Sequence, residues 1–113
     1  LGFEEIFQFD SSSIDFQSSY YCKSIILQKK LEHKRTQVIL ALADNGIGTS
    51  VYYPRPVPRL TYYKEKYDCS VGQFPEATKI ADNSIALPVG PHMKSGDAEY
   101  IADSVIEVAK KLL

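Results

Sequence analysis

The sequence predicts a small α+β domain, in which an antiparallel sheet of about three strands carries helices packed on one face. Three observations predict this class. The chain has 113 residues, which suits one domain. Hydrophobic residues make up 44% and charged residues 24%, enough for a core under a polar surface. Short β-rich runs alternate with longer segments of helix-forming residues.

Three short runs are predicted strands. Residues 20–27 are rich in tyrosine, isoleucine and leucine, and residues 47–53 and 84–89 are similar in character. Pro88 lacks a backbone donor, so it places the last strand at an edge or at its own end.

One helix is predicted on each side of the proline-rich stretch. Residues 35–45 contain no glycine or proline, and Gly46 follows as a left-handed stop. Apolar residues crowd the middle of this helix, so most of its circumference should be covered. Gly46 and Gly48 precede a strand instead of a helix, which favours this helix stop over a phosphate loop. Residues 59–67 should form a short helix.

The remaining helices have clear boundary signals. Pro75 suits the first turn of a helix that runs to about residue 83. Asp97 is expected to cap a last helix through Leu113. In this helix one apolar stripe recurs at three- and four-residue steps: Ala98, Ile101, Ala102, Val105, Val108, Ala109 and Leu112.

Composition excludes several function classes. The net charge of −1 argues against nucleic-acid binding, and no apolar run approaches the length of about 20 residues that spans a bilayer. Cys22 and Cys69 form no metal-type pair, which favours reduced thiols in the cytoplasm. His33 and His92 have no partners at metal-ligand spacing, so we predict no metal site and no catalytic residue in this chain.

The proline-rich loop, residues 52–59, is the candidate binding segment. It joins two aromatic side chains and two guanidinium groups on a backbone stiffened by three prolines, with the candidate residues Tyr52, Tyr53, Arg55 and Arg59. Arginine forks bind phosphate or carboxylate, and a stiff loop has little entropy to lose on binding. The alternative is a packed connection with solvent-facing arginines. The nearby tyrosines Tyr62, Tyr63 and Tyr67 could form a stacking surface, but the helical spacing of Tyr63 and Tyr67 favours a core or interface position for these two.

From residue 20 to 113 the order of motifs resembles the C-terminal small domain of the DegT/StrS family, the pyridoxal-phosphate-dependent sugar aminotransferases of fold type I. Arg35 opens the first helix, and a Gly-Ile-Gly-Thr turn follows at 46–49. Next come a Tyr-Tyr-Pro stretch at 52–54, a Pro-Glu-Ala-Thr helix start at 75–78 and an Ala-Leu-Pro strand at 86–88. Tyr52 stands where many members have histidine, and Thr78 where many have glutamate.

The resemblance implies a parent enzyme that transfers an amino group, commonly from glutamate, to a keto-sugar nucleotide. Its pyridoxal phosphate would be held by a Schiff-base lysine of a large domain, and no match to that domain is found here. Residues 1–19 would then be an arm that docks on the large domain, and residues 20–113 the small domain. A homodimer in the cytoplasm is expected for the parent, with Tyr52, Tyr53, Arg55 and Arg59 at the substrate and with no nucleic-acid or membrane partner.

Two other functions remain open at this point. The chain is alternatively a stand-alone α+β binding or interaction module derived from such an enzyme. A small metal- or thiol-dependent enzyme has little support from the lone histidines and cysteines. The absence of an initiator methionine favours a piece of a longer chain. An exposed apolar patch near residues 3–9 and 62–67 would indicate a missing partner surface, whereas a fully polar exterior would favour the stand-alone module.

Overall fold

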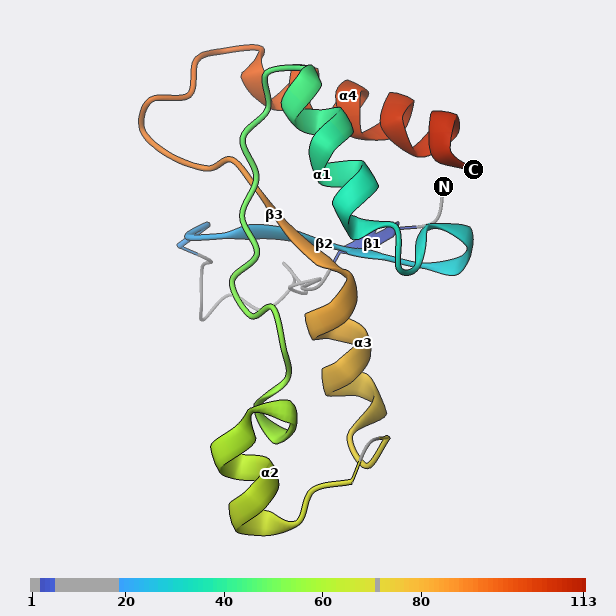
Figure 1. Ribbon diagram of the computed structural model, residues 1–113. Coiled ribbons are helices and arrows are strands. Elements are labelled where there is room, and N and C mark those ends of the chain that lie inside the picture. Colours follow the sequence, from blue (N-terminus) through green and yellow to red (C-terminus); the bar gives the residue numbers. More distant parts are fainter. Residues whose placement is uncertain (1–2, 6–18, 71) are drawn as a thin grey trace, which may run out of the picture.

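The fold is known from a computed structural model, which describes residues 3–5, 19–70 and 72–113 (Figure 1). Its elements, in chain order, are β1 (Phe3–Glu5), β2 (Lys23–Leu27), the 3-10 turn η1 (Lys29–Leu31), α1 (Arg35–Asp44), the 3-10 turn η2 (Val57–Arg59), α2 (Thr61–Tyr67), α3 (Pro75–Asn83), β3 (Ser84–Leu87) and α4 (Asp97–Leu112). The α+β class is confirmed.

The strands β1, β2 and β3 form one antiparallel sheet with β2 in the centre. In the β2–β3 pair, Ile25 lies opposite Ile85. Both strands fall within predicted runs, and β3 is an edge strand that ends just before Pro88, as the missing backbone donor of proline requires.

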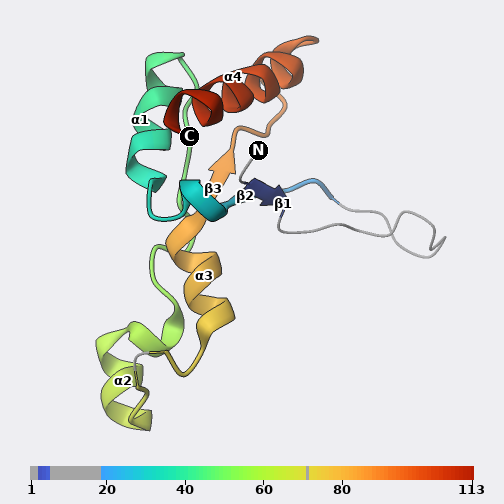
Figure 2. The same ribbon diagram turned by 90° about the vertical axis from the view of Figure 1, so that its right-hand side faces the viewer.

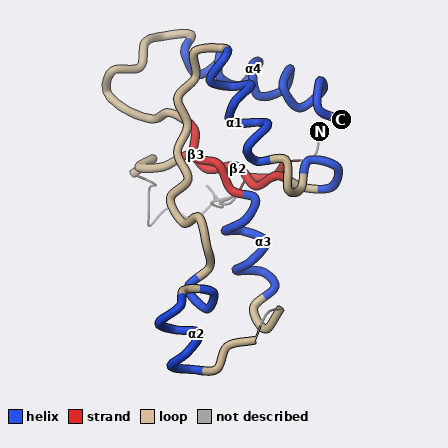
Figure 3. Tube along the Cα trace, in the orientation of Figure 1, coloured by secondary structure: helices blue, strands red, loops and turns tan. Residues whose placement is uncertain are grey.

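The strand predicted at residues 47–53 is wrong. This segment touches the sheet at one isolated bridge, where Ser50 pairs with Ala86, and Figure 3 draws it as part of the long tan loop after α1. Its β-rich composition favours an extended backbone, but a strand also needs a continuous hydrogen-bonding partner. Only Ser50 finds that partner on β3.

The strand β1 was not predicted, because residues 1–19 were assigned to a docking arm. Residues 3–5 pair with the central strand, with Phe3 opposite Leu27, while docking of residues 1–19 on a large domain stays a prediction. The other apolar residues on which the arm rested, Ile6, Phe7 and Phe9, lie outside the described residues.

A hydrophobic core lies between one sheet face and the helix pair α1 and α4, which lie side by side above the sheet in Figures 1 and 2. The alternation of strand side chains sends Ile25, Leu27 and Ile85 to this face. The helices contribute most of the remaining buried residues: Val38, Leu42, Val105, Val108 and Ala109. The apolar stripe of α4 is therefore confirmed at its central positions.

Not all helices cover the same face. The helix α3 extends to the other side of the sheet and carries α2 at its far end, away from α1 and α4 (Figures 1 and 2). The prediction of helices on one face thus holds for α1 and α4 and is wrong for α2 and α3. The pattern of each helix shows which side is apolar but not which sheet face will meet it.

Two local predictions for helix ends have different outcomes. Gly46 follows α1 with φ +74°, so the left-handed stop is confirmed. The Asp97 cap is wrong, because Gly96 is the N-cap of α4. The Asp97 carboxylate instead accepts a hydrogen bond from the Lys94 backbone N–H at 2.7 Å.

The burial of α1 and α2 is also less than predicted. In α1 only Val38 and Leu42 are buried, and Leu40 is 60% exposed. Within the described part of the chain α2 has no buried residue. Its tyrosines pack on one another instead, with the rings of Tyr63 and Tyr67 stacked at a centroid distance of 6.2 Å. These tyrosines are not core residues of this chain.

Candidate functional site

An apolar groove of about 490 Å³ lies beside the sheet and is the candidate site. Its floor consists of small side chains from the two longer strands, Ser24, Ser84 and Ala86, and α3 forms one wall. The proline-rich loop supplies Tyr52, Tyr53, Arg55, Pro56 and Val57 to the lining. Three of the four predicted site residues are therefore brought together.

Tyr52 contacts a second tyrosine from the segment just before β2. The ring centroids of Tyr21 and Tyr52 are 6.4 Å apart. The neighbouring Tyr21 phenol raises the pKa of Tyr52 above its usual value, and partial desolvation and Cys22 add to this effect. Tyr52 is therefore a neutral phenol at physiological pH, able to donate a hydrogen bond as well as accept one.

Tyr53 and Arg55 present polar groups at the groove. Tyr53 is 75% exposed, so its ring and hydroxyl are accessible. Arg55 is exposed and has no hydrogen-bond or ion-pair partner among the residues that the structure describes. An uncommitted guanidinium beside an apolar surface suits a ligand with an anionic group next to a ring.

Arg59 occupies a different position from the other three. It lines a separate hollow, and one of its guanidinium nitrogens donates to both carboxylate oxygens of Asp82 on α3, at 2.8 and 2.6 Å. Its charge is thus already matched within this chain.

Sequence reasoning missed the contributions of β2 and α3 to the groove. Cys22 and Ser24 line it and their side-chain heteroatoms lie 3.1 Å apart, while Ile80 and Ala81 line it from α3. A weak signal was present at alternate positions before and within β2, where Cys22 and Ser24 place small side chains on one side of the extended chain. Nothing in the local sequence indicated that α3 would lie beside it.

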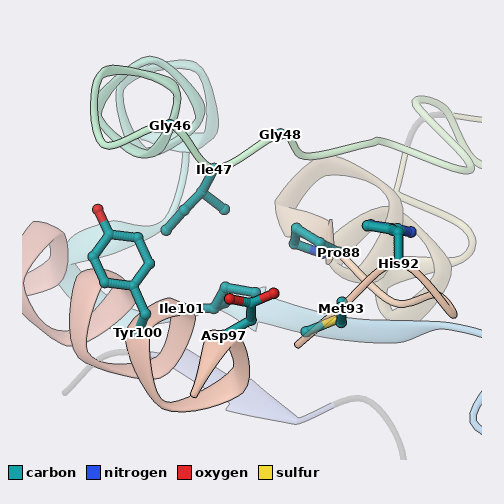
Figure 4. Close-up of a pocket in the computed structure, with 9 residues that line it drawn as sticks. All are labelled: Gly46, Ile47, Gly48, Pro88, His92, Met93, Asp97, Tyr100 and Ile101. Atoms are coloured by element: carbon teal, nitrogen blue, oxygen red, sulfur yellow. The ribbon is translucent and has the colours of Figure 1, made fainter. Parts of the chain in front are cut away.

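A second hollow, of about 470 Å³, lies between the end of α1, the start of α4 and the loop that joins β3 to α4 (Figure 4). His92 and Asp97 line it, but the Asp97 carboxylate is used to hold the loop. The Tyr100 hydroxyl likewise donates to the Asn45 carbonyl at 2.9 Å. The polar groups of this hollow fasten loops together, so it is the weaker candidate.

The described residues also bear on the predictions about metal sites, cysteines and membrane spans. No group of three or more metal-ligating side chains is found there. Cys22 and Cys69 are both free thiols. No helix in residues 3–5, 19–70 and 72–113 combines the length and apolarity needed for crossing a bilayer. His33 uses its backbone N–H to bind the buried Asn83 side chain and does not line the groove.

Comparison with known sequences identifies relatives of this chain. A sequence model described as the DegT/DnrJ/EryC1/StrS aminotransferase family matches residues 3–106. The "Pleiotropic regulatory protein" of Geobacillus stearothermophilus is 35% identical over 79 residues, which cover 66% of this chain and 20% of that protein. The dTDP-3-amino-3,4,6-trideoxy-alpha-D-glucose transaminase of Streptomyces venezuelae is 30% identical over 79 residues, 70% of this chain and 21% of that enzyme.

A solved structure gives the same result. The putative sugar aminotransferase Spr1654 from Streptococcus pneumoniae, in its PMP form, is 27% identical with a TM-score of 0.70, over 81% of this chain and 23% of that chain. Its PLP form gives a TM-score of 0.69. The present chain therefore spans about a fifth to a quarter of the length of the relatives that it matches.

Proposed function

We propose that this chain, which belongs to the DegT/DnrJ/EryC1/StrS aminotransferase family, is the C-terminal domain of a longer pyridoxal-phosphate-dependent enzyme. That enzyme would transfer an amino group from an amino acid, glutamate in our proposal, to a keto-sugar nucleotide. This domain would supply one wall of the substrate pocket and would be inactive alone. The observation that carries the proposal is the groove with Tyr52, Tyr53 and Arg55 at its edge.

The chemistry of the groove fits a sugar nucleotide. Such a ligand carries a diphosphate between rings, and Arg55 offers for those charges a guanidinium that has no partner among the described residues. The phenols of Tyr52 and Tyr53 offer hydrogen bonds and flat apolar faces to rings and hydroxyl groups. Pro54 lies between Tyr53 and Arg55, and Pro56 follows Arg55, so both prolines restrict the backbone that carries these side chains and less entropy is lost on binding.

The cofactor belongs in the rest of the polypeptide under this proposal. When bound, pyridoxal phosphate supplies the electron sink for amino transfer and needs a lysine amine to hold it. No described lysine lines the groove, so the residues present do not fit this cofactor. The contribution proposed for this chain is limited to binding and orienting the substrate.

The exposed tyrosines of α2 support the proposal that another part of the enzyme packs against this helix. Tyr62 and Tyr67 are 61% and 60% exposed, and the helix that carries them lacks buried residues in the described chain. A helix of seven residues has little stability alone in water, so packing against other parts of the enzyme is expected. We propose that the large domain, in a homodimer, covers this face. The two free thiols agree with our proposal of a cytoplasmic enzyme.

The test uses the full-length enzyme and a substitution at the groove. Arg55→Ala should raise the KM for the keto-sugar nucleotide about tenfold to a hundredfold, because a charged hydrogen bond contributes about 1.5–3 kcal/mol. The KM for the amino donor should not change. Initial-rate kinetics with each substrate varied in turn measure both constants.

Lys94→Ala is the matched control, because it also removes an exposed cation but lies in the loop before α4, away from the groove. It should leave both KM values unchanged. If Arg55→Ala behaves like Lys94→Ala, this groove is not the substrate pocket.

A further inference from the structure

The proline-rich loop is attached to the rest of the domain at both ends. At its start, Ser50 and Ala86 exchange two backbone hydrogen bonds, of 3.0 and 2.8 Å. At its end, the Arg59 guanidinium binds the Asp82 carboxylate. Among the described residues, the backbone of residues 51–55 has no hydrogen bond to another element. Hydrogen bonds therefore attach the loop on both sides of residues 51–55, in addition to the ring contact of Tyr52 with Tyr21.

Both attachment points lie on one continuous piece of structure. Asp82 is in the last turn of α3, and Ala86 is in β3, which begins at the residue after α3 ends. Figure 1 shows the green segment from α1 to α2 running past β3 and α3. Tyr53 and Arg55 lie between the two points, so their positions at the groove depend on both.

The placement of Asp82 has an energetic cost for its own helix. A carboxylate in the last turn lies near the negative end of the helix dipole, which destabilises the helix. No basic residue lies in the last turn of α3 to offset it. Arg59 provides the compensating charge from 23 positions away in the sequence. The pair thus offsets this cost only while the loop stays against α3, and so it links the two segments.

We propose that Asp82 is a positioning residue for the substrate pocket, which through Arg59 fixes the far end of the proline-rich loop and so the placement of Tyr53 and Arg55. This inference rests on the proposed function for its effect on substrate binding. The loop attachment itself does not depend on that function. Arg59 then acts by holding the loop in place.

The experiment replaces Asp82 in the full-length enzyme. The pair is partly exposed, with side chains 41% and 28% accessible, so its contribution is at most about 1 kcal/mol, which corresponds to about a fivefold change in KM. Asp82→Asn should raise the KM for the sugar nucleotide about threefold to fivefold and leave kcat within about twofold.

A second variant should change thermal stability and substrate binding in opposite directions. Asp82→Arg improves the charge at the end of α3 but repels Arg59. We expect its melting temperature to equal or exceed that of the parent while the KM rises further. A residue with only a structural role would change both in the same unfavourable sense. The double substitution Arg59→Asp with Asp82→Arg should return the KM to near its original value.

Hydrogen exchange reports on the loop without reference to activity. The Arg59 and Leu60 amides donate to the Pro56 and Val57 carbonyls in η2, so they are protected while the end of the loop is held. Their exchange should become severalfold faster in Asp82→Asn. Glu107→Gln is the matched control, since it removes a different surface ion pair, that with Lys111 at 2.7 Å, and should change neither exchange nor KM.

Two outcomes would overturn the inference. One is unchanged exchange at Arg59 and Leu60 in Asp82→Asn. The other is an unchanged KM in Asp82→Asn while Arg55→Ala raises it, which would leave the proposed pocket intact and remove only the positioning role. An unchanged KM in both variants would instead contradict the proposed function.

Discussion

Gly46 combines a left-handed backbone with open space around its α-carbon. Its φ is +74°, and a β-carbon at this position would meet no other atom within 4 Å. A larger residue here would therefore suffer backbone strain but no collision. The helix α1 needs this conformation, because the Gly46 and Ile47 amides bind the Ala43 and Leu42 carbonyls at the end of the helix.

At this position we predict that Gly46→Ala lowers the free energy of unfolding by about 1–2 kcal/mol, as the left-handed strain of a non-glycine residue requires. Urea denaturation measures it. Gly48→Ala is the control, because Gly48 also has open space but no positive φ, and it should change stability by less than about 0.5 kcal/mol. Equal effects of the two substitutions would contradict the strain argument.

The residue scale also shows where sequence reasoning ends. Gly46 was predictable, because a helix stop is set by its immediate neighbours. The role of Asn83 was not. Its side chain is buried, accepting from the His33 N–H and donating to the Lys79 carbonyl, both at 3.0 Å. Its partner His33 and the Asp82 partner Arg59 are distant in sequence, so no local pattern indicates either contact.

The helix α1 shows how an element that was predicted correctly can still be misjudged in its surroundings. Its bounds follow from helix-forming residues and the glycine stop. Its apolar residues suggested cover on nearly every side, yet the sheet and α4 cover only the side of Val38 and Leu42. The prediction of strands from composition is limited in the same way. Residues 47–53 have the composition of a strand but no continuous hydrogen-bonding partner, whereas β1 has a partner but no strand-like sequence pattern.

The two faces of α1 allow a matched comparison. Leu42→Ala should lower the free energy of unfolding by about 2–5 kcal/mol, since Leu42 is fully buried in the core. Leu40→Ala, on the same helix but 60% exposed, should change it by less than about 0.5 kcal/mol. Thermal and urea unfolding of both variants test this. A comparable loss at Leu40 would show that another part of the polypeptide covers this side of α1.

For the whole molecule, the distribution of exposed aromatic residues is uneven. The helix α2 lies at the end away from the core and carries Tyr62, Tyr63 and Tyr67 with mutual ring contacts of 5.1 and 6.2 Å. A grouped aromatic surface on a protruding helix is typical of an interaction site. The family and the α+β class were predictable from motif order, whereas this geometry depends on how α3 leaves the sheet.

This surface predicts a property of the 113-residue chain when it is produced alone. We expect it to self-associate at micromolar concentrations, because exposed aromatic rings remain without their partner. Replacing Tyr62, Tyr63 and Tyr67 together by serine should shift it toward a monomer in sedimentation velocity. Tyr100→Ser, at an exposed tyrosine on α4, should not. If the unsubstituted 113-residue chain is strictly monomeric, that result would count against a partner surface on α2.

The direct junction of α3 and β3 restricts how this domain tolerates changes in chain length. Asn83 ends the helix and Ser84 begins the strand, with no connecting residue. One inserted residue would rotate α3 by about 100° relative to β3, or else exchange the two faces of the strand. Either would separate Ile85 from the core or Asp82 from the loop. Length variation should therefore concentrate at segments such as residues 68–70, 72–73 and 90–96, which lie between elements and are largely exposed.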